Sequence, residues 1–105
     1  MDALSNDLHL CLTQLGVNPK RYGDTVPEYI KRLLQLLTPD DEQLVISHYG
    51  LFGHQAVSLA MLAQTHHIDE NALQGQLISS LRKIAITPEW QMLLPMTKLK
   101  AIKLK

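Results

Sequence analysis

Apolar residues recur three and four positions apart along most of this chain, which is the spacing that gathers them on one face of an α-helix. The first stripe lies within residues 4–15, with Ser5 as a start signal and Gly16, which can adopt left-handed geometry, as a stop. Its inward positions are Leu8, Cys11, Leu12 and Leu15. This pattern predicts an amphipathic helix over residues 4–15.

A second stripe follows the turn at Asn18-Pro19. Thr25-Val26-Pro27-Glu28 has the form of a capping box, in which the threonine hydroxyl and the glutamate carboxylate bind amides that the first helical turn leaves unpaired. The apolar positions that follow share one face: Val26, Ile30, Leu33, Leu34 and Leu37. We expect a second amphipathic helix with a structural role.

Three further start signals occur in the middle of the chain. Thr38-Pro39-Asp40-Asp41 predicts a helix to about Tyr49, because proline fits the first helical position and acids favour the positive end of the helix dipole. Gly50 offers its stop. Ser58 predicts a short helix that ends at His66-His67, and Asp69 caps a longer helix with Leu73, Leu77, Leu81 and Ile84 on its inner face. These last two helices meet at a tight turn.

The chain ends with a proline-capped segment and a basic stretch. Thr87-Pro88-Glu89-Trp90 predicts a final short helix ending near Pro95, with residues 96–105 as a basic tail. Residues 98–105 alternate basic and apolar residues except at Ala101-Ile102, and they have no partner strand. We therefore predict an all-α fold, a compact bundle of about six helices containing a helix-turn-helix.

Composition narrows the class of protein without changing this picture. A length of 105 residues suits one compact domain, and 46 % apolar residues is ordinary for a globular fold. The single cysteine, Cys11, lies on the apolar stripe, where a buried thiol is expected rather than a nucleophile. Neither a secretory signal nor an apolar run long enough to span a bilayer is evident, so we expect a cytoplasmic protein with no membrane partner.

The order of short motifs in residues 37–94 points to a known module. A helix that opens with Asp40-Asp41-Glu42 ends in Tyr49-Gly50-Leu51. A glycine-containing loop follows and leads to Ser58-Leu59-Ala60-Met61-Leu62-Ala63. Farther along, the chain has Leu81-Arg82-Lys83-Ile84 and then Thr87-Pro88. In this order and spacing, the segment resembles the fourth conserved region of the sigma-70 family of bacterial transcription initiation factors. Each string is weak alone, but their joint order is moderately specific.

The resemblance implies a division of the chain and a function. Residues 37–95 would form the helix-turn-helix, with residues 1–36 as a helical pair packed on it in one structural domain. The protein would regulate transcription by binding double-stranded DNA, with a contact to RNA polymerase or another transcription protein. The segment that matches the polymerase-contacting part of the family contains Leu44, Val45, Tyr49 and Leu51, which could equally be plain core.

The candidate DNA-reading residues follow from helical geometry. If Leu73, Leu77, Leu81 and Ile84 face the core, then Glu70, Asn71, Gln74 and Ile78 point away, beside the gap left by Gly75. Asn71 and Gln74 could pair with adenine edges in the major groove. Ser79, Arg82 and Lys83 are candidates for phosphate contacts.

The charge of the chain favours a second interpretation. The family usually carries several arginines on its recognition helix, where this sequence has Glu70, Ala72, Gln74 and Ser79. Most nonspecific affinity for DNA comes from basic side chains that neutralise phosphates. A recognition helix without net positive charge should therefore bind DNA weakly, unless the lysines from Lys98 to Lys105 also contact phosphate. The alternative is a protein-interaction module, a sigma-like adaptor or antagonist that kept the fold but not base reading, with a homodimer as one form.

Other kinds of site have little support in the sequence. The five histidines, His9, His48, His54, His66 and His67, do not show the spacing of a metal site, so we expect no metal and no other cofactor. His66 and His67 are interpreted as turn residues. Because no glycine-rich phosphate loop occurs and Asp40, Asp41 and Glu42 are explained as helix-start charges, we do not expect an enzyme.

Overall fold

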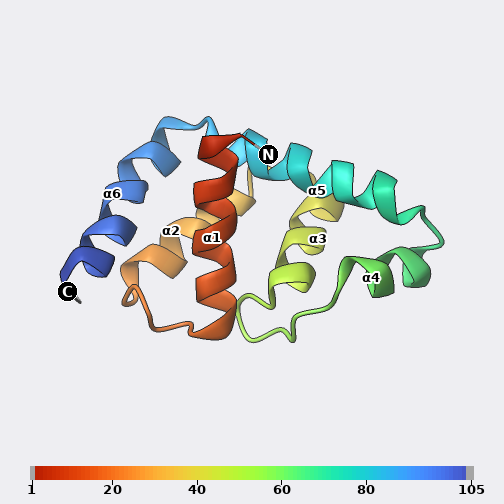
Figure 1. Cartoon of the computed structure of the whole chain (residues 1–105), viewed down its shortest axis with the longest axis horizontal. Coiled ribbons are helices and arrows are strands. Elements are labelled where there is room, and N and C mark those ends of the chain that lie inside the picture. Colours follow the sequence, from red (N-terminus) through yellow and green to blue (C-terminus); the bar gives the residue numbers. More distant parts are fainter. Residues whose placement is uncertain (1, 104–105) are drawn as a thin grey trace.

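Six α-helices account for most of the computed structural model, which describes the backbone of residues 2–103 and the side chains of residues 2–97 (Figure 1). They are α1 (Ala3–Val17), α2 (Thr25–Leu34), α3 (Pro39–Tyr49), α4 (Leu59–His66), α5 (Glu70–Ala85) and α6 (Pro88–Lys103). The described residues contain no strand. The predicted all-α fold of about six helices is confirmed.

Four of the helices begin at the predicted caps. The side-chain oxygen of Thr38 accepts a hydrogen bond from the Asp41 amide at 3.3 Å, and Ser58 accepts one from Met61 at 3.2 Å. Asp69 and Thr87 cap α5 and α6 in the same way. Each bond satisfies an amide that the first turn would otherwise leave unpaired, so local sequence sets these helix starts.

The start of α1 differs from the prediction. Asp2, rather than Ser5, caps the helix, and its carboxylate accepts a hydrogen bond from the Ser5 amide at 2.8 Å. Ser5 itself lies inside the helix and is buried. At the other end, α1 continues one residue beyond Gly16 and ends at Val17.

The predicted capping box at α2 is not formed. Thr25 is the first helical residue, and the preceding Asp24 makes no side-chain capping bond. Asp24 already has right-handed helical backbone angles, φ −89° and ψ −23°, whereas a capping residue needs extended ones. The turn that precedes α2 therefore removes the geometry that a capping box requires.

The predicted end of the last helix at Pro95 is also wrong. Helix α6 contains Pro95 and continues to Lys103. Proline removes the amide that would bond the carbonyl of Gln91, but both residues are exposed, so water can satisfy that carbonyl. The lysine side chains proposed for a basic tail, at positions 98, 100, 103 and 105, lie outside the described side chains.

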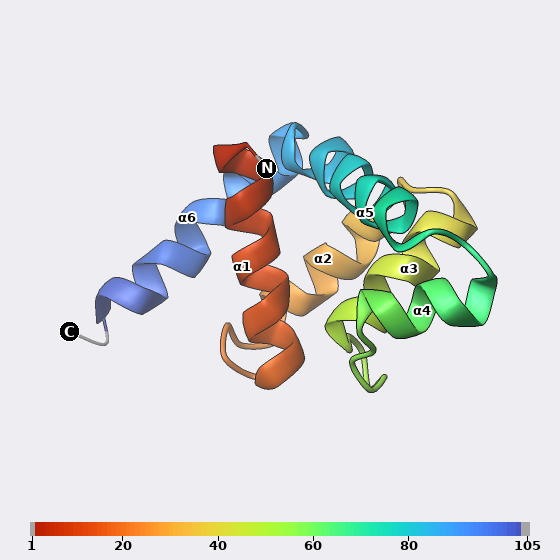
Figure 2. The same ribbon diagram turned by 45° about the vertical axis from the view of Figure 1, so that its right-hand side comes forward.

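The helices form an elongated molecule, with principal extents of 43 × 25 × 23 Å. Helix α1 crosses the middle and packs against α5, α3 and α6 (Figures 1 and 2). Helices α3 and α4 pack against α5 at one end, and α2 packs against α6 at the other. Residues 2–36 thus build part of the same core as the segment that follows them.

That core is continuous and draws on every helix. Trp90 of α6 is completely buried, as are Leu8 and Leu12 of α1 and Leu81 of α5. Phe52, in the loop after α3, is aromatic but remains 38 % exposed.

Helices α1 and α3 approach closely at their carboxyl ends. A Cβ atom added to Gly16 would collide with the backbone carbonyl of Tyr49. Gly50, the residue after Tyr49, has left-handed angles, φ 68° and ψ 47°, and ends α3 as predicted. Glycine is therefore required at two positions where α1 meets the end of α3.

Candidate functional site

The connection between α4 and α5 is short and held by backbone hydrogen bonds. His67 takes left-handed angles, φ 56° and ψ 43°, at the end of α4. Its amide donates to the carbonyl of Gln64 at 3.3 Å, and the amide of Ile68 donates to that of Ala63 at 2.9 Å. This pair of bonds is a Schellman motif, and Asp69 caps α5 directly after it. The turn therefore fixes the angle between the two helices.

Helix α5 has one buried face and one open face. Leu73, Leu77, Leu81 and Ile84 are at most 5 % exposed, as the spacing predicted. The outer flank of α5, which we define as Asn71, Gln74, Gly75, Ser79 and Arg82, is exposed. Ile78, expected to point away from the core, is partly buried. The flank proposed for base contacts is thus accessible.

No atom lies within 4 Å of a Cβ added to Gly75, so the middle of the outer flank has open space above the helix backbone. Asn71 lies about one turn before this gap and Gln74 directly before it, in the first turns of α5. An amide of either side chain could therefore reach a ligand that approaches this part of the helix closely.

The two basic residues of α5 lie next to acids. Arg82 Nε is 3.9 Å from a carboxylate oxygen of Asp2, and Lys83 Nζ is 3.9 Å from one of Asp41. The basic side chains are 70 % and 58 % exposed. The pair of Arg82 with Asp2 is long and exposed on both sides, so solvent screens it and it contributes little to stability. A phosphate could therefore replace the Asp2 carboxylate beside Arg82.

Asp41 connects α3 to α5 more firmly than the ion pair alone suggests. The side-chain amide of Gln76 donates a hydrogen bond to Asp41 at 2.7 Å. Asp41 is only 14 % exposed at its side chain. Gln76 therefore faces α3 rather than the outer flank, and Asp41 acts as an anchor for α5, a role that the sequence did not indicate.

The surroundings of the outer flank are acidic at one end. Asp69 and Glu70 open α5, and no basic residue occurs between them and Arg82. At the other end, the start of α1 lies beside Arg82, whose side chain pairs with Asp2. An incoming molecule therefore has free access to the first half of α5, whereas α1 borders the second half.

The four residues considered for polymerase or partner contact are buried. Leu44, Val45, Tyr49 and Leu51 are 7 %, 0 %, 6 % and 2 % exposed. Their side chains pack in the core, which was the alternative explanation. Burial also raises the pKa of the Tyr49 hydroxyl, which lies 2.7 Å from Nδ1 of His9 and so joins α3 to α1.

Two other histidines hold the loop between α3 and α4. Nδ1 of His48 lies 3.0 Å from the carbonyl oxygen of Val57, and Nδ1 of His54 lies 3.0 Å from that of Leu51. Because a carbonyl only accepts, each imidazole donates its Nδ1 proton there. Within the described residues, no three histidine, cysteine or acidic side chains gather as metal ligands would.

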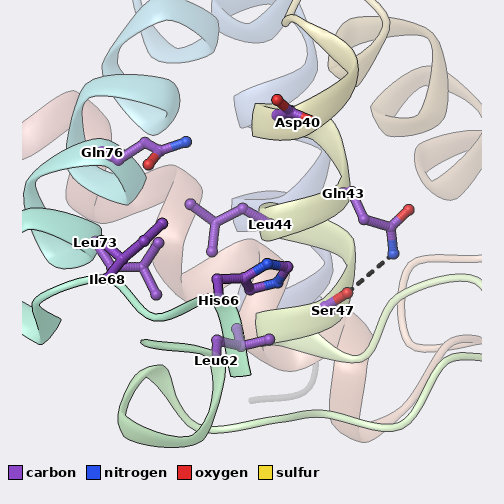
Figure 3. A pocket seen from close by; sticks show the side chains of 9 residues that line it. All are labelled: Asp40, Gln43, Leu44, Ser47, Leu62, His66, Ile68, Leu73 and Gln76. Atoms are coloured by element: carbon purple, nitrogen blue, oxygen red, sulfur yellow. Dashed lines mark hydrogen bonds between the residues drawn. The ribbon is translucent and has the colours of Figure 1, made fainter. Parts of the chain in front are cut away.

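A cavity that the sequence did not predict lies between α3, α4 and α5. It has a volume of about 360 Å³ (Figure 3). Its apolar lining consists of Leu44, Leu62, Ile68 and Leu73, and its polar lining of Asp40, Gln43, Ser47, His66 and Gln76. These residues come from three helices and, for Ile68, the α4–α5 turn. They are distant in sequence, so no local motif could have revealed the cavity.

The end of α6 lies far from this part of the molecule. In both views, α6 leads away to one end, whereas the α4–α5 turn is at the opposite end (Figures 1 and 2). The helix that carries residues 96–103 therefore does not run beside the outer flank of α5.

In the part of the chain that the structure describes, no helix combines the length and apolar character needed to cross a bilayer. Searches among family models, curated proteins and solved structures give no match to this chain.

Proposed function

We propose that this protein binds double-stranded DNA through a helix-turn-helix formed by α4 and α5 and thereby regulates transcription. The observation that carries the proposal is the open polar flank of α5, held at a fixed angle by the α4–α5 turn. A helix-turn-helix works in this way, because the first helix braces the second while residues near the start of the second meet base edges.

Asn71 and Gln74 are the proposed base-reading residues. Both are exposed in the first turns of α5, where a recognition helix enters the major groove. The carboxamide of either residue can donate a hydrogen bond to N7 of adenine and accept one from its N6 amino group. Such a two-point contact is worth about 1–3 kcal/mol of discrimination against other bases. Ser79, Arg82 and Lys83, farther along α5, are the proposed phosphate contacts.

The few basic residues on α5 limit the affinity that we expect. If Arg82 and Lys83 are the main cations that reach phosphate, DNA binding releases about two counterions. A plot of the logarithm of affinity against the logarithm of salt concentration should then have a slope of about −2. Binding should therefore be weak, and it should depend less on salt than binding by a strongly basic reader does.

Fluorescence anisotropy with labelled duplex DNA tests the proposal. A target is first selected from a pool of random duplexes at low ionic strength, and the affinity for it is then measured for the wild-type protein and for the double variant Asn71→Ala/Gln74→Ala. We expect the double variant to lose at least about tenfold of its preference for the target over unrelated duplexes.

Gln14→Ala is the matched control, because Gln14 is an exposed amide residue on α1. It should leave the preference unchanged. No measurable binding of any duplex at low ionic strength would overturn the proposal. An unchanged preference in the double variant would exclude Asn71 and Gln74 as the reading residues.

A protein-interaction module is the second candidate, and the charge distribution favours it. Residues 37–86 contain five acidic and two basic side chains, a net of three negative charges, which disfavours approach to phosphate. The cavity beside α5 adds a recess of a kind that a partner's side chains can fill. The anisotropy titration separates the two candidates, since this one predicts no binding of DNA.

A further inference from the structure

The cavity between α3, α4 and α5 is separate from the flank proposed for DNA. Asn71, Gln74 and Ser79 do not line it, and Gln76, which does, faces α3 through Asp41. Its lining combines apolar and polar side chains, and Ile68 in it is 43 % exposed. An apolar side chain placed in this cavity would remove exposed apolar surface from water, which is favourable.

The charges around the cavity define which occupant it suits. Asp40 is part of the lining, and Asp41 and Glu42 follow it in the first turn of α3. Asp69 and Glu70 open α5 near Ile68 and Leu73, which also belong to the lining. An occupant with apolar side chains flanked by cations would match this cavity in both shape and charge.

One segment of the chain itself has this composition. Residues 96–105 read Met-Thr-Lys-Leu-Lys-Ala-Ile-Lys-Leu-Lys, with four lysines, no acid and four large apolar residues. Helix α6 leads into this segment and exposes Met92 at 78 % and Met96 at 42 %. Residues 87–105 carry four basic and one acidic side chain, a net of three positive charges, equal and opposite to residues 37–86.

The same copy of the chain cannot make this contact in the observed fold. The cavity and the far end of α6 lie at opposite ends of a molecule 43 Å long (Figures 1 and 2). Two complementary surfaces at opposite ends of one molecule lead to contact between copies, in which each copy offers its carboxyl-terminal segment to the next.

We propose that the cavity between α3, α4 and α5 binds residues 96–105 of a second copy of this chain, so that the protein associates head to tail. The apolar residues of the segment fill the recess over Leu44, Leu62, Ile68 and Leu73, and its lysines pair with Asp40 and the neighbouring acids. Unless the copies close into a ring, such a contact leaves a free cavity at one end and a free segment at the other, so further copies add and the mean mass grows with concentration. The outer flank of α5 stays free.

Sedimentation velocity as a function of protein and salt concentration tests this inference on the full chain. The wild-type mass should rise with concentration and fall with salt, because the contact pairs opposite charges. Two variants should each weaken association at least about tenfold. Ile68→Lys blocks the cavity with a cation, and Lys100→Glu/Lys103→Glu reverses charge in the segment.

Each variant has a matched control elsewhere on the surface. Ile86→Lys changes an isoleucine that is 57 % exposed and lies outside the cavity lining. Lys20→Glu/Lys31→Glu makes the same charge change on exposed lysines near and within α2. Both controls should associate as the wild-type protein does, and circular dichroism verifies that each variant is folded.

Mixing the two variants distinguishes contact between the cavity and the segment from contact between two like surfaces. The Ile68→Lys protein retains an intact segment, and the Lys100→Glu/Lys103→Glu protein retains an intact cavity, so an equal mixture should form a one-to-one complex and grow no further. A wild-type protein that stays monomeric at all concentrations would overturn the inference. Association that persists in both variants, or a mixture that stays monomeric, would also overturn it.

A peptide keeps the inference testable should a variant unfold. A labelled peptide of residues 92–105 should bind the dilute wild-type protein, and Asp40→Lys should weaken that binding at least about tenfold. Asp24→Lys, at an exposed acid outside the cavity, is its control. Absence of peptide binding would contradict the inference. Because DNA binding by the wild-type protein is measured separately, the proposed DNA binding and the proposed association can each fail alone.

Discussion

Single residues explain where α1 and α3 can meet. Gly16 is part of α1, where alanine would ordinarily favour the helix, yet its missing side chain leaves room for the carbonyl of Tyr49. The sequence indicated a helix end at this glycine, since glycine is common there. Its role as a contact point between two helices depends on tertiary structure and had no local signal.

Gly16→Ala should therefore destabilise the protein by roughly 1–3 kcal/mol, because a Cβ atom forces α1 away from α3. Gly75→Ala is the control, since nothing lies within 4 Å of its added Cβ. That change should stabilise the protein by about 0.5–1 kcal/mol through the helical preference of alanine. Urea denaturation measures both, and a stabilising effect of Gly16→Ala would refute the close approach.

Cys11 illustrates a residue whose surroundings were predictable. It lies on the inner stripe of α1, is 3 % exposed, and burial raises the pKa of its thiol to about 12. The thiol of the unfolded chain ionises near pH 9. Because the folded state holds the proton at higher pH than the unfolded state, ionisation favours unfolding as the pH rises from about 9 toward 12.

The unfolding free energy should accordingly fall more steeply with pH above about 9 in the wild-type protein than in Cys11→Ala, by up to about 1.4 kcal/mol per pH unit. Denaturant titrations of both proteins at several pH values measure this difference. Because both proteins retain Tyr49, the contribution of its hydroxyl to the pH dependence cancels in the comparison. Parallel curves for the two proteins would show that the thiol is not protected by the fold.

Helix boundaries followed local sequence wherever the capping residue is extended. Thr38, Ser58 and Asp69 have extended backbone angles and accept the predicted hydrogen bonds three residues on. Prediction failed at Thr25, where the turn before α2 is already helical, and at Pro95, where exposure lets water replace a lost bond. In both cases the surroundings of the residue, backbone conformation for Thr25 and solvent for Pro95, decided the outcome rather than the residue type.

A matched pair of threonines tests this difference. Thr38→Ala removes the cap of α3 and should cost about 1 kcal/mol of stability. Thr25→Ala removes no capping bond and should change stability by less than about 0.5 kcal/mol. Thermal unfolding of the two variants gives the comparison, and equal losses would mean that Thr25 caps α2 in solution.

At the scale of the whole molecule, the sequence predicted the elements better than their surroundings. It placed Asn71, Gln74, Ser79, Arg82 and Lys83 on the outer side of the helix, and the structure leaves them exposed. It did not indicate the ion pairs of Arg82 with Asp2 and of Lys83 with Asp41, nor the cavity beside α5. Those features join segments that are distant in sequence, so they depend on how the helices pack.

The central claim is that the outer flank of α5 is the surface that meets DNA. Nuclear magnetic resonance titration of the isotope-labelled protein with duplex DNA tests it most directly. We expect the largest shift changes at the backbone and side-chain amides of Asn71 and Gln74 and at Ser79, with smaller ones at the start of α4. Changes confined to α6, or to α3 and the cavity, would contradict it.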